Sequence, residues 1–165
     1  MQEPQSKEAL VDWRAVGWAG LLAGALQLGL ILLWLPGQVG GDGAGMLRLM
    51  ASVLVGEELL DATGSPPVGV LGMAIGLHFV IALSVAGLIA LVLHRFGLWV
   101  GVFGGGLLGL CVYTIHMYAV AMTVAPQLTY LEGLPFALCH IAFGALAGGI
   151  YELLEVERYA SEVPA

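Results

Sequence analysis

Long apolar stretches alternate with short polar ones along this chain, and the apolar stretches contain no charged residue. Four such stretches cover residues 15–41, 65–93, 96–131 and 133–151. About 20 predominantly apolar residues in a helix cross the hydrocarbon core of a bilayer, so each stretch can supply one transmembrane helix. The pattern therefore predicts membrane spans at about residues 13–35, 68–93, 98–124 and 134–154.

The composition supports the same fold class. The chain is 59% apolar and 10% charged, whereas soluble domains carry about a quarter charged residues. Every backbone polar group must be paired inside the bilayer, and the Gly- and Leu-rich stretches favour helices over barrel strands. We predict an all-α integral membrane four-helix bundle, a single transmembrane domain over residues 1–165 that is embedded in a lipid bilayer.

Aromatic residues near the span ends mark the membrane interfaces, and basic residues indicate the orientation of the spans. Trp and Tyr residues lie near the proposed ends, as interfacial anchors do: Trp13, Trp18, Trp34, Trp99, Tyr130 and Tyr151. Four spans place Lys7, Arg14, Arg95 and Arg158 on one side of the membrane and Arg48 on the other. Both termini are therefore expected in the cytoplasm, with the loops at residues 37–67 and 125–133 on the outside.

The longer outer loop has a pattern of its own. The first span is expected to stop at "PGQVGGDGAG", a run of helix breakers. "MLRLMASVLVGEELLD" then repeats apolar residues at helical spacing, which predicts a helix over about 44–61 at the outer membrane surface. This helix is either a plain connector or a lid or docking surface for a partner.

The N-terminus, the net charge and the two cysteines argue against a signal peptide, a nucleic-acid partner and a disulfide, respectively. The polar N-terminus lacks the basic segment and small-residue cleavage site of a removable signal peptide, so the first span is expected to be retained. A net charge of −7 without a basic cluster argues against nucleic acid as a partner. Cys111 and Cys139 should differ in depth by about 10 Å, so no disulfide is expected between them.

Spans two and four share a pattern of a histidine followed by small residues. His78 precedes Ala82, Ala86 and Gly87, and His140 precedes Gly144, Gly148 and Gly149. "VGWAG" in span one also matches "VGVFG" in span three, which raises the hypothesis of two tandem hairpins related by a parallel duplication. Glycines spaced by four residues give every span a small face for close helix packing, within the bundle or against other subunits.

These residues carry a loose family resemblance. "G-x-H" at Gly76–His78 and "H-x-x-x-G-x-x-x-G-x-x-Y" from His140 to Tyr151 follow a glycine-rich first span. The chain resembles small four-span bacterial inner-membrane proteins without a settled biochemical activity. The resemblance spans roughly residues 16–151 and implies the fold and a bacterial inner (cytoplasmic) membrane location, with no activity attached.

The histidines within the spans are the candidate site residues. One hypothesis is a haem b held by His78 and His140 on separate helices, which predicts a Soret band that disappears in His78→Ala or His140→Ala. A second is a metal site that adds His116, with Met117 or Cys139 as a soft ligand favouring copper. A third is structural, with hydrogen bonds to neighbours such as Ser84, Thr114, Tyr113 or Tyr118. His94, beside Arg95, is expected to be solvated.

The functional prediction also depends on the acidic residues and catalytic motifs that the predicted spans do not contain. Carboxylates inside the membrane are typical of ion pumps and proton relays, and here the acidic residues fall in loops or at the inner end of span four. We found no nucleophile with a base, phosphate loop or zinc-protease motif. We therefore predict a non-catalytic subunit that packs against other membrane subunits, in an electron-transfer complex. The alternatives are a redox protein that binds a cofactor through His78, His140 and His116, and an oligomeric channel or small-solute carrier.

Overall fold

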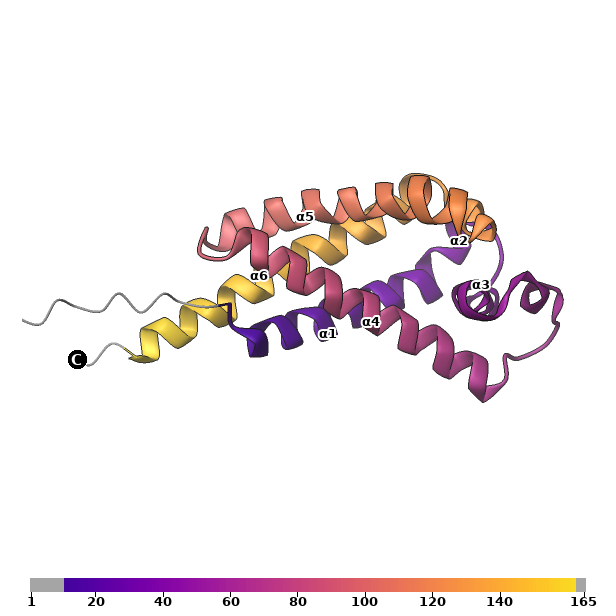
Figure 1. The fold of residues 1–165 in the computed structure, drawn as a ribbon, viewed down its shortest axis with the longest axis horizontal. Helices are drawn as coiled ribbons and strands as arrows, with labels where there is room; N and C mark the ends of the chain where they lie inside the picture. Colours follow the sequence, from indigo (N-terminus) through magenta and orange to yellow (C-terminus); the bar gives the residue numbers. More distant parts are fainter. Residues whose placement is uncertain (1–10, 163–165) are drawn as a thin grey trace, which may run out of the picture.

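The computed structural model describes residues 11–162 of the chain, with side chains up to residue 155, and contains four long apolar helices. These are α1 (Trp13–Gly29) with its π-helical extension η1 (Leu30–Trp34), α4 (Val68–Leu93), α5 (Leu98–Ile115) with its π-helical extension η3 (His116–Ala121), and α6 (Leu134–Glu162). They lie side by side along one direction (Figure 1). The all-α four-helix membrane bundle is therefore confirmed, and the predicted spans coincide with these helices.

The connections between the long helices contain short helical elements. These are α2 (Pro36–Val39), α3 (Gly43–Val55), and the 3₁₀ helices η2 (Glu57–Asp61) and η4 (Pro126–Leu131). The predicted outer helix corresponds to α3 and η2. Asp42 caps α3 by accepting a hydrogen bond from the Gly45 amide at 2.7 Å. Gly56, at φ +106°, ends the helix in a conformation that favours glycine.

The first long helix continues past the proline that begins the breaker run. The chain stays helical through Pro36 to Val39 and ends at Gly40, whose φ is +87°. Just before the proline, the Leu35 amide donates to the Leu30 carbonyl at 2.8 Å, an i to i−5 bond of the π type. Proline has no N–H and its ring crowds the preceding turn. The wider π turn accommodates it, and the helical segment ends inside the predicted breaker run "PGQVGGDGAG", one turn after its proline.

Helices α5 and α6 are in direct backbone contact. A Cβ atom added at Gly105 would strike the Gly144 carbonyl, and one at Gly101 would strike Gly148. One added at Gly109 would strike the His140 carbonyl. Glycine faces allow membrane helices to approach until their backbones touch. The small-residue faces predicted for spans three and four are therefore used within the chain.

Helix α1 uses its own small face against α4. A Cβ added at Gly20 would lie 3.1 Å from the Cα atom of Leu83, and one at Gly24 would lie 3.0 Å from Ala82 Cβ. The buried cluster around this contact also includes Phe143 and Tyr151 of α6, so α1 is held by two helices. A second buried cluster, nearer α3, joins Ile31, Leu35, Met117 and Phe136 among others.

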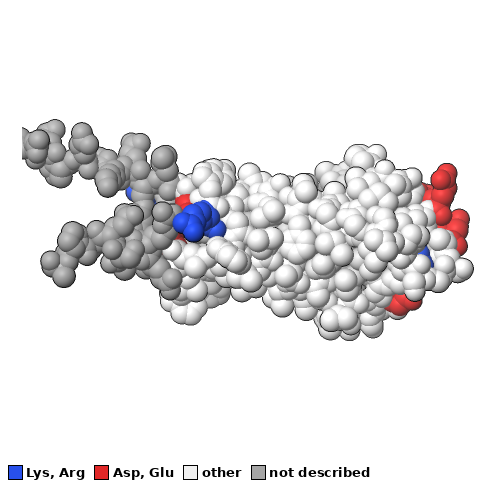
Figure 2. All heavy atoms as spheres, turned by 90° about the horizontal axis from the view of Figure 1, so that it is seen from below, with Lys and Arg blue, Asp and Glu red and all other residues white. Residues whose placement is uncertain are grey.

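The surface of the bundle has the charge distribution of a membrane protein. A broad uncharged band lies between the two ends of the bundle, and the charged side chains gather at those ends (Figure 2). Within the band, large apolar side chains point outward, including Trp18, Val80, Leu88, Phe103 and Leu107. Such a surface is stable against lipid and unfavourable in water. The parallel duplication of the two hairpins remains a prediction.

The contact between α5 and α6 generates the first prediction. Gly105→Ala places a methyl group against the backbone of α6, which no side-chain rotation relieves. We expect the free energy of unfolding to fall by about 1–3 kcal/mol, the usual cost of overpacking. Thermal unfolding in detergent, followed by circular dichroism, measures the change. The matched control is Gly17→Ala, where no heavy atom lies within 4 Å. Equal melting temperatures for the two variants would show that the helices are not in backbone contact.

Candidate functional site: a cavity lined by three histidines

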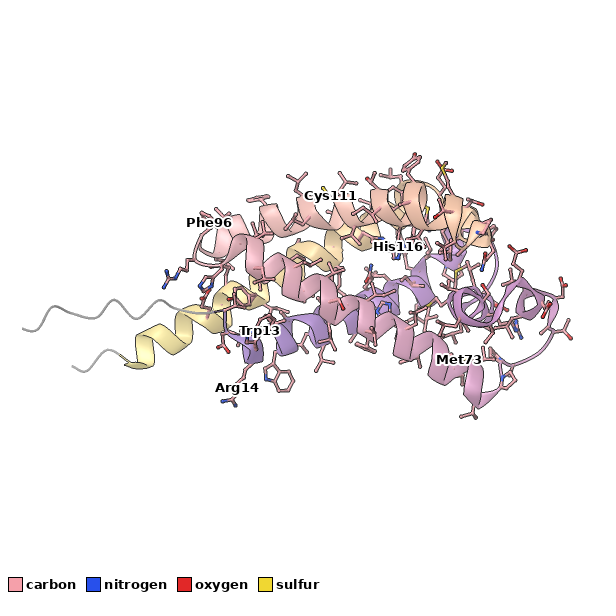
Figure 3. All side chains as sticks on the ribbon, viewed as in Figure 1. Trp13, Arg14, Met73, Phe96, Cys111 and His116 are labelled. Carbon is pink, nitrogen blue, oxygen red and sulfur yellow. The ribbon has the colours of Figure 1, made fainter. Side chains whose placement is uncertain are left out.

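All three candidate histidines line one cavity of about 100 Å³ inside the bundle. His78 comes from α4, His116 from the start of η3 and His140 from α6. Except for the side chain of Gln27, the rest of the wall is apolar, with Ile31, Met50, Val53, Leu77, Ile81, Ala82, Val85, Val112, Met117, Leu128, Leu131, Phe136 and Phe143. Figure 3 shows His116 on the side of its helix that faces α4 and α6.

His140 makes two hydrogen bonds that define its protonation. Its Nδ1 atom lies 3.0 Å from the Phe136 carbonyl, one turn earlier in α6. A carbonyl only accepts, so Nδ1 carries the hydrogen and Nε2 of the neutral ring is an acceptor. Nε2 lies 3.0 Å from His116 Nδ1, which therefore donates to it. The neutral His116 ring is left with an acceptor at Nε2.

His78 is oriented by a bond to another helix. Its Nε2 atom lies 2.9 Å from the Gly24 carbonyl of α1, to which it donates. Nδ1 of the neutral ring is then an acceptor, with no hydrogen bond to any described residue. The ring of Phe79 meets the imidazole edge-on at 5.4 Å between centroids. His78 and His140 thus share a cavity but make different hydrogen bonds, one across helices and one within its own helix.

Gln27 is a polar residue of the site that the sequence analysis did not single out. It lies on α1 with 7% of its surface exposed, and its side chain makes no hydrogen bond with the described residues. A buried amide without a partner loses its hydrogen bonds to water, which is costly unless a ligand or water supplies them. The available signal was that Gln27 is a lone amide within the first uncharged span.

The hydroxyl partners proposed for the histidines are engaged elsewhere. Ser84 and Thr114 donate to carbonyls in their own helices, those of Val80 and Leu110. The Tyr113 hydroxyl accepts from the Gly133 amide. Tyr118 donates to Glu132 at 3.3 Å. The histidines are held instead by backbone carbonyls and by each other.

The cavity is least enclosed where α4, α5, η3 and α3 line it. Its partly exposed wall residues are Leu77 and Ile81 of α4, Val112 of α5, His116, and Met50 and Val53 of α3. Residues of η1 and α6 that line it, such as Ile31, Phe136 and Phe143, are buried. Because α4 and α5 are both candidate membrane spans, this less enclosed side, the opening of the cavity, lies on the lateral surface of the bundle.

The arrangement determines which groups the cavity can hold. No set of three or more His, Cys, Asp or Glu side chains among the described residues is placed to bind a metal. Met117 lines the cavity, whereas Cys139 is buried outside its wall. An apolar cavity of about 150 Å³ binds benzene, and a haem is several times larger than a benzene ring. At about 100 Å³ in this conformation, the cavity would have to widen to hold a porphyrin.

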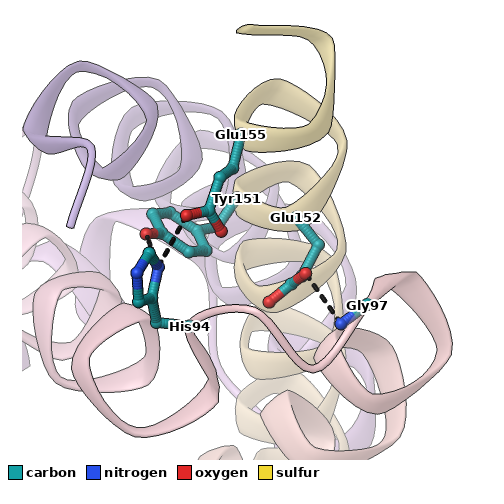
Figure 4. A network of polar contacts seen from close by, with 5 residues as sticks. All are labelled: His94, Gly97, Tyr151, Glu152 and Glu155. Atoms are coloured by element: carbon teal, nitrogen blue, oxygen red, sulfur yellow. Dashed lines mark hydrogen bonds and ion pairs between the residues drawn. The ribbon is translucent and has the colours of Figure 1, made fainter. Parts of the chain in front are cut away.

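The C-terminal part of α6 belongs to a polar cluster around His94, which the sequence analysis expected to be solvated. His94 Nδ1 lies 2.6 Å from Glu155 Oε1 and 2.9 Å from the Tyr151 hydroxyl (Figure 4). Glu155 is 4% exposed and Tyr151 1% exposed, because α1 and the end of α4 pack over them. The expectation of a solvated His94 was therefore wrong.

Glu152 in this cluster caps a different helix. Its Oε2 atom accepts from the Gly97 amide at 2.9 Å, at the start of α5 (Figure 4). Gly97 has no side chain to cap α5 itself, and the positive end of the helix dipole favours a carboxylate there. The turn between α4 and α5, with Arg95 at φ +72°, is thereby tied to α6. Glu152 thus has a direct structural role.

Comparison with known proteins adds no assignment to this site. No family model, curated protein or solved structure matches the chain.

The hydrogen bonds of the site predict the histidine tautomers. We expect neutral His140 to carry its hydrogen on Nδ1, because Nδ1 faces the Phe136 carbonyl. We expect neutral His78 to carry it on Nε2, because Nε2 faces the Gly24 carbonyl. Two-bond ¹⁵N–¹H correlation spectra of histidine-labelled protein in detergent distinguish the two forms. The variants His78→Gln and His140→Gln assign the signals, and the same tautomer at both positions would contradict the described geometry.

Proposed function

We propose that this chain is a non-catalytic integral membrane protein that binds a small molecule from the lipid phase in the three-histidine cavity. The observation that carries this proposal is a mostly apolar cavity with unused hydrogen-bonding groups on His78, His116 and Gln27. Small-molecule sites combine apolar walls with a few placed polar groups in this way. The lateral opening lined by α4 and α5 gives a ligand a route from the bilayer.

The size and wall of the cavity define the kind of ligand. The enclosed space of about 100 Å³ is smaller than the cavity of about 150 Å³ that binds benzene, so a single ring would fill it and extend, with any tail, into the opening. The Phe136 and Phe143 side chains in the wall suit the flat face of a ring. The redox alternative with haem b requires the wall to move apart and His140 to give up a hydrogen bond.

Toluene binding tests the proposal. We expect ¹H saturation transfer from the detergent-solubilised protein to toluene, and competition between ligands of similar size. Ile81→Trp narrows the opening from α4 and should weaken toluene binding at least about tenfold, because it removes the space for a ring.

The matched control lies one residue away. Val80 is 63% exposed on the outer face of α4 and does not line the cavity, so Val80→Trp should leave toluene binding unchanged. Equal binding to both variants, or no saturable binding to the unmodified protein, would contradict a ligand site in the cavity.

The orientation in the membrane belongs to the same proposal. Arg14 at the start of α1 and Arg95 in the turn between α4 and α5 lie at one end of the bundle, and Arg48 of α3 lies towards the other (Figure 1). An excess of basic residues favours the cytoplasmic side. We propose a bacterial inner-membrane location with both termini in the cytoplasm.

A second candidate function is that of a subunit in a larger membrane complex, as in electron transfer. Most glycine faces are occupied within the chain, but one on α4 is not. A Cβ added at Gly69, Gly72 or Gly76 would meet no heavy atom within 4 Å. A small-residue face that is open in the monomer is suited to close contact with another helix.

The mass of the gently solubilised protein tests this second function. A stable complex with other membrane subunits predicts a native mass well above the 17.2 kDa of one chain. Gly76→Leu places a large side chain on the open face of α4 and should shift the protein to its single-chain mass. The control is Val92→Ala on α4, an exposed position away from these glycines. A monomer at all detergent concentrations would contradict the subunit role.

A further inference from the structure

We infer that the ligand of the three-histidine cavity is a ring with hydroxyl groups and an apolar tail, the chemical class of the quinols. This inference rests on the proposed function and specifies the ligand of that same site. It follows from the ring and amide atoms that make no hydrogen bond within the protein, and from whether each of these atoms donates or accepts a hydrogen bond.

The free ring nitrogens of the cavity accept hydrogen bonds. His140 Nδ1 donates to the Phe136 carbonyl, so Nε2 of the neutral ring is an acceptor. His116 Nδ1 therefore donates to His140 Nε2. His116 therefore offers a lone pair at Nε2. His78 donates from Nε2 to the Gly24 carbonyl and offers a lone pair at Nδ1. Rings buried among apolar side chains stay neutral, because burial of a charge without a partner is costly. A ligand that matches these two acceptors must bring O–H or N–H donors.

Gln27 completes the recognition of a hydroxyl group. Its amide is buried on α1 beside the histidines and has no partner among the described residues. An amide NH₂ can donate to a hydroxyl oxygen whose hydrogen is given to an imidazole. A hydroxyl both donates and accepts, whereas a quinone carbonyl only accepts. The site therefore favours the reduced, hydroxyl-bearing ring over the oxidised one.

The tail follows from the position of the opening. Leu77 and Ile81 of α4 and Val112 of α5 form an apolar, partly exposed rim on the lateral surface of the bundle. A polar tail passing between these side chains would lose its hydration, whereas an alkyl tail continues into the acyl chains of the bilayer.

The experiment compares three probes of equal shape on the purified full-length protein in detergent. The probes are a decyl-substituted benzoquinol, the matching benzoquinone, and decylbenzene, each measured by displacement of toluene. We expect the quinol to bind at least about tenfold more tightly than the quinone, since one lost hydrogen bond is equivalent to about a factor of ten. The quinone can accept from Gln27 but cannot donate to the histidines, so it should bind more weakly than the quinol and no more weakly than decylbenzene.

The variant His116→Leu tests which atom makes the distinction. It keeps the apolar wall and removes the acceptor Nε2, so the quinol should lose about tenfold in affinity while decylbenzene binding stays the same. The retained binding of decylbenzene shows that the variant is folded. The control is Thr114→Val on the exposed face of the same helix, where the hydroxyl only bonds to the Leu110 carbonyl. This control should keep the preference for the quinol.

Each other outcome has a distinct meaning. Equal binding of quinol and quinone overturns the inferred ligand class and leaves the proposed function intact, because a ring is still bound. A preference for the quinol that survives His116→Leu overturns the role of His116 Nε2. If none of the three probes displaces toluene, or if toluene itself does not bind, the proposed function fails together with the inference.

Discussion

Backbone contact between α5 and α6 is the constraint on which the rest of the structure depends. Gly101, Gly105 and Gly109 form one face of α5 and lie against the backbone of α6. His116 follows Gly109 by two helical turns, so it continues the same face. At the distance that glycine permits, its ring reaches His140 Nε2 at 3.0 Å. A larger residue at Gly109 would displace the His140 carbonyl and separate the two rings, so the helix contact and the site are one feature.

A second constraint is the scarcity of water inside a membrane. Polar atoms at that depth need partners within the protein, and most of those in this bundle have them. His140 bonds at both nitrogens, and the exposed hydroxyls of Ser84 and Thr114 bond to their own helices. The unused groups on His78, His116 and Gln27 line one cavity, whereas other buried side-chain atoms without a hydrogen bond lie away from it, on Arg48, Gln127, Glu152 and Glu155. An apolar cavity lined by three residues with unused groups supports a ligand site there.

The C-terminal part of α6 follows the same rule with charged groups. Glu152 and Glu155 lie within the last span, 1% and 4% exposed, beside His94 and the amide of Gly97. Their contacts connect the turn between α4 and α5 to α6. The two halves of α6 thus have different roles: its N-terminal half contributes His140 to the cavity, and its C-terminal half anchors the turn between α4 and α5.

The sequence alone determined the all-α membrane bundle, because uncharged stretches of span length have few other stable structures and hydrophobicity is a local property. It also identified His78, His116 and His140 as unusual residues, since an imidazole in such a stretch is conspicuous. Only the tertiary structure decided what surrounds them. The bond from His78 to Gly24 joins residues 54 positions apart, and the burial of His94 depends on Tyr151, 57 positions away. Which ring nitrogen of each histidine donates depends on the group that the ring contacts. The nitrogens that remain as hydrogen-bond acceptors in the cavity are decided by the same contacts. That pairing is decided by helix packing and cannot be obtained from the spacing of residues in one chain.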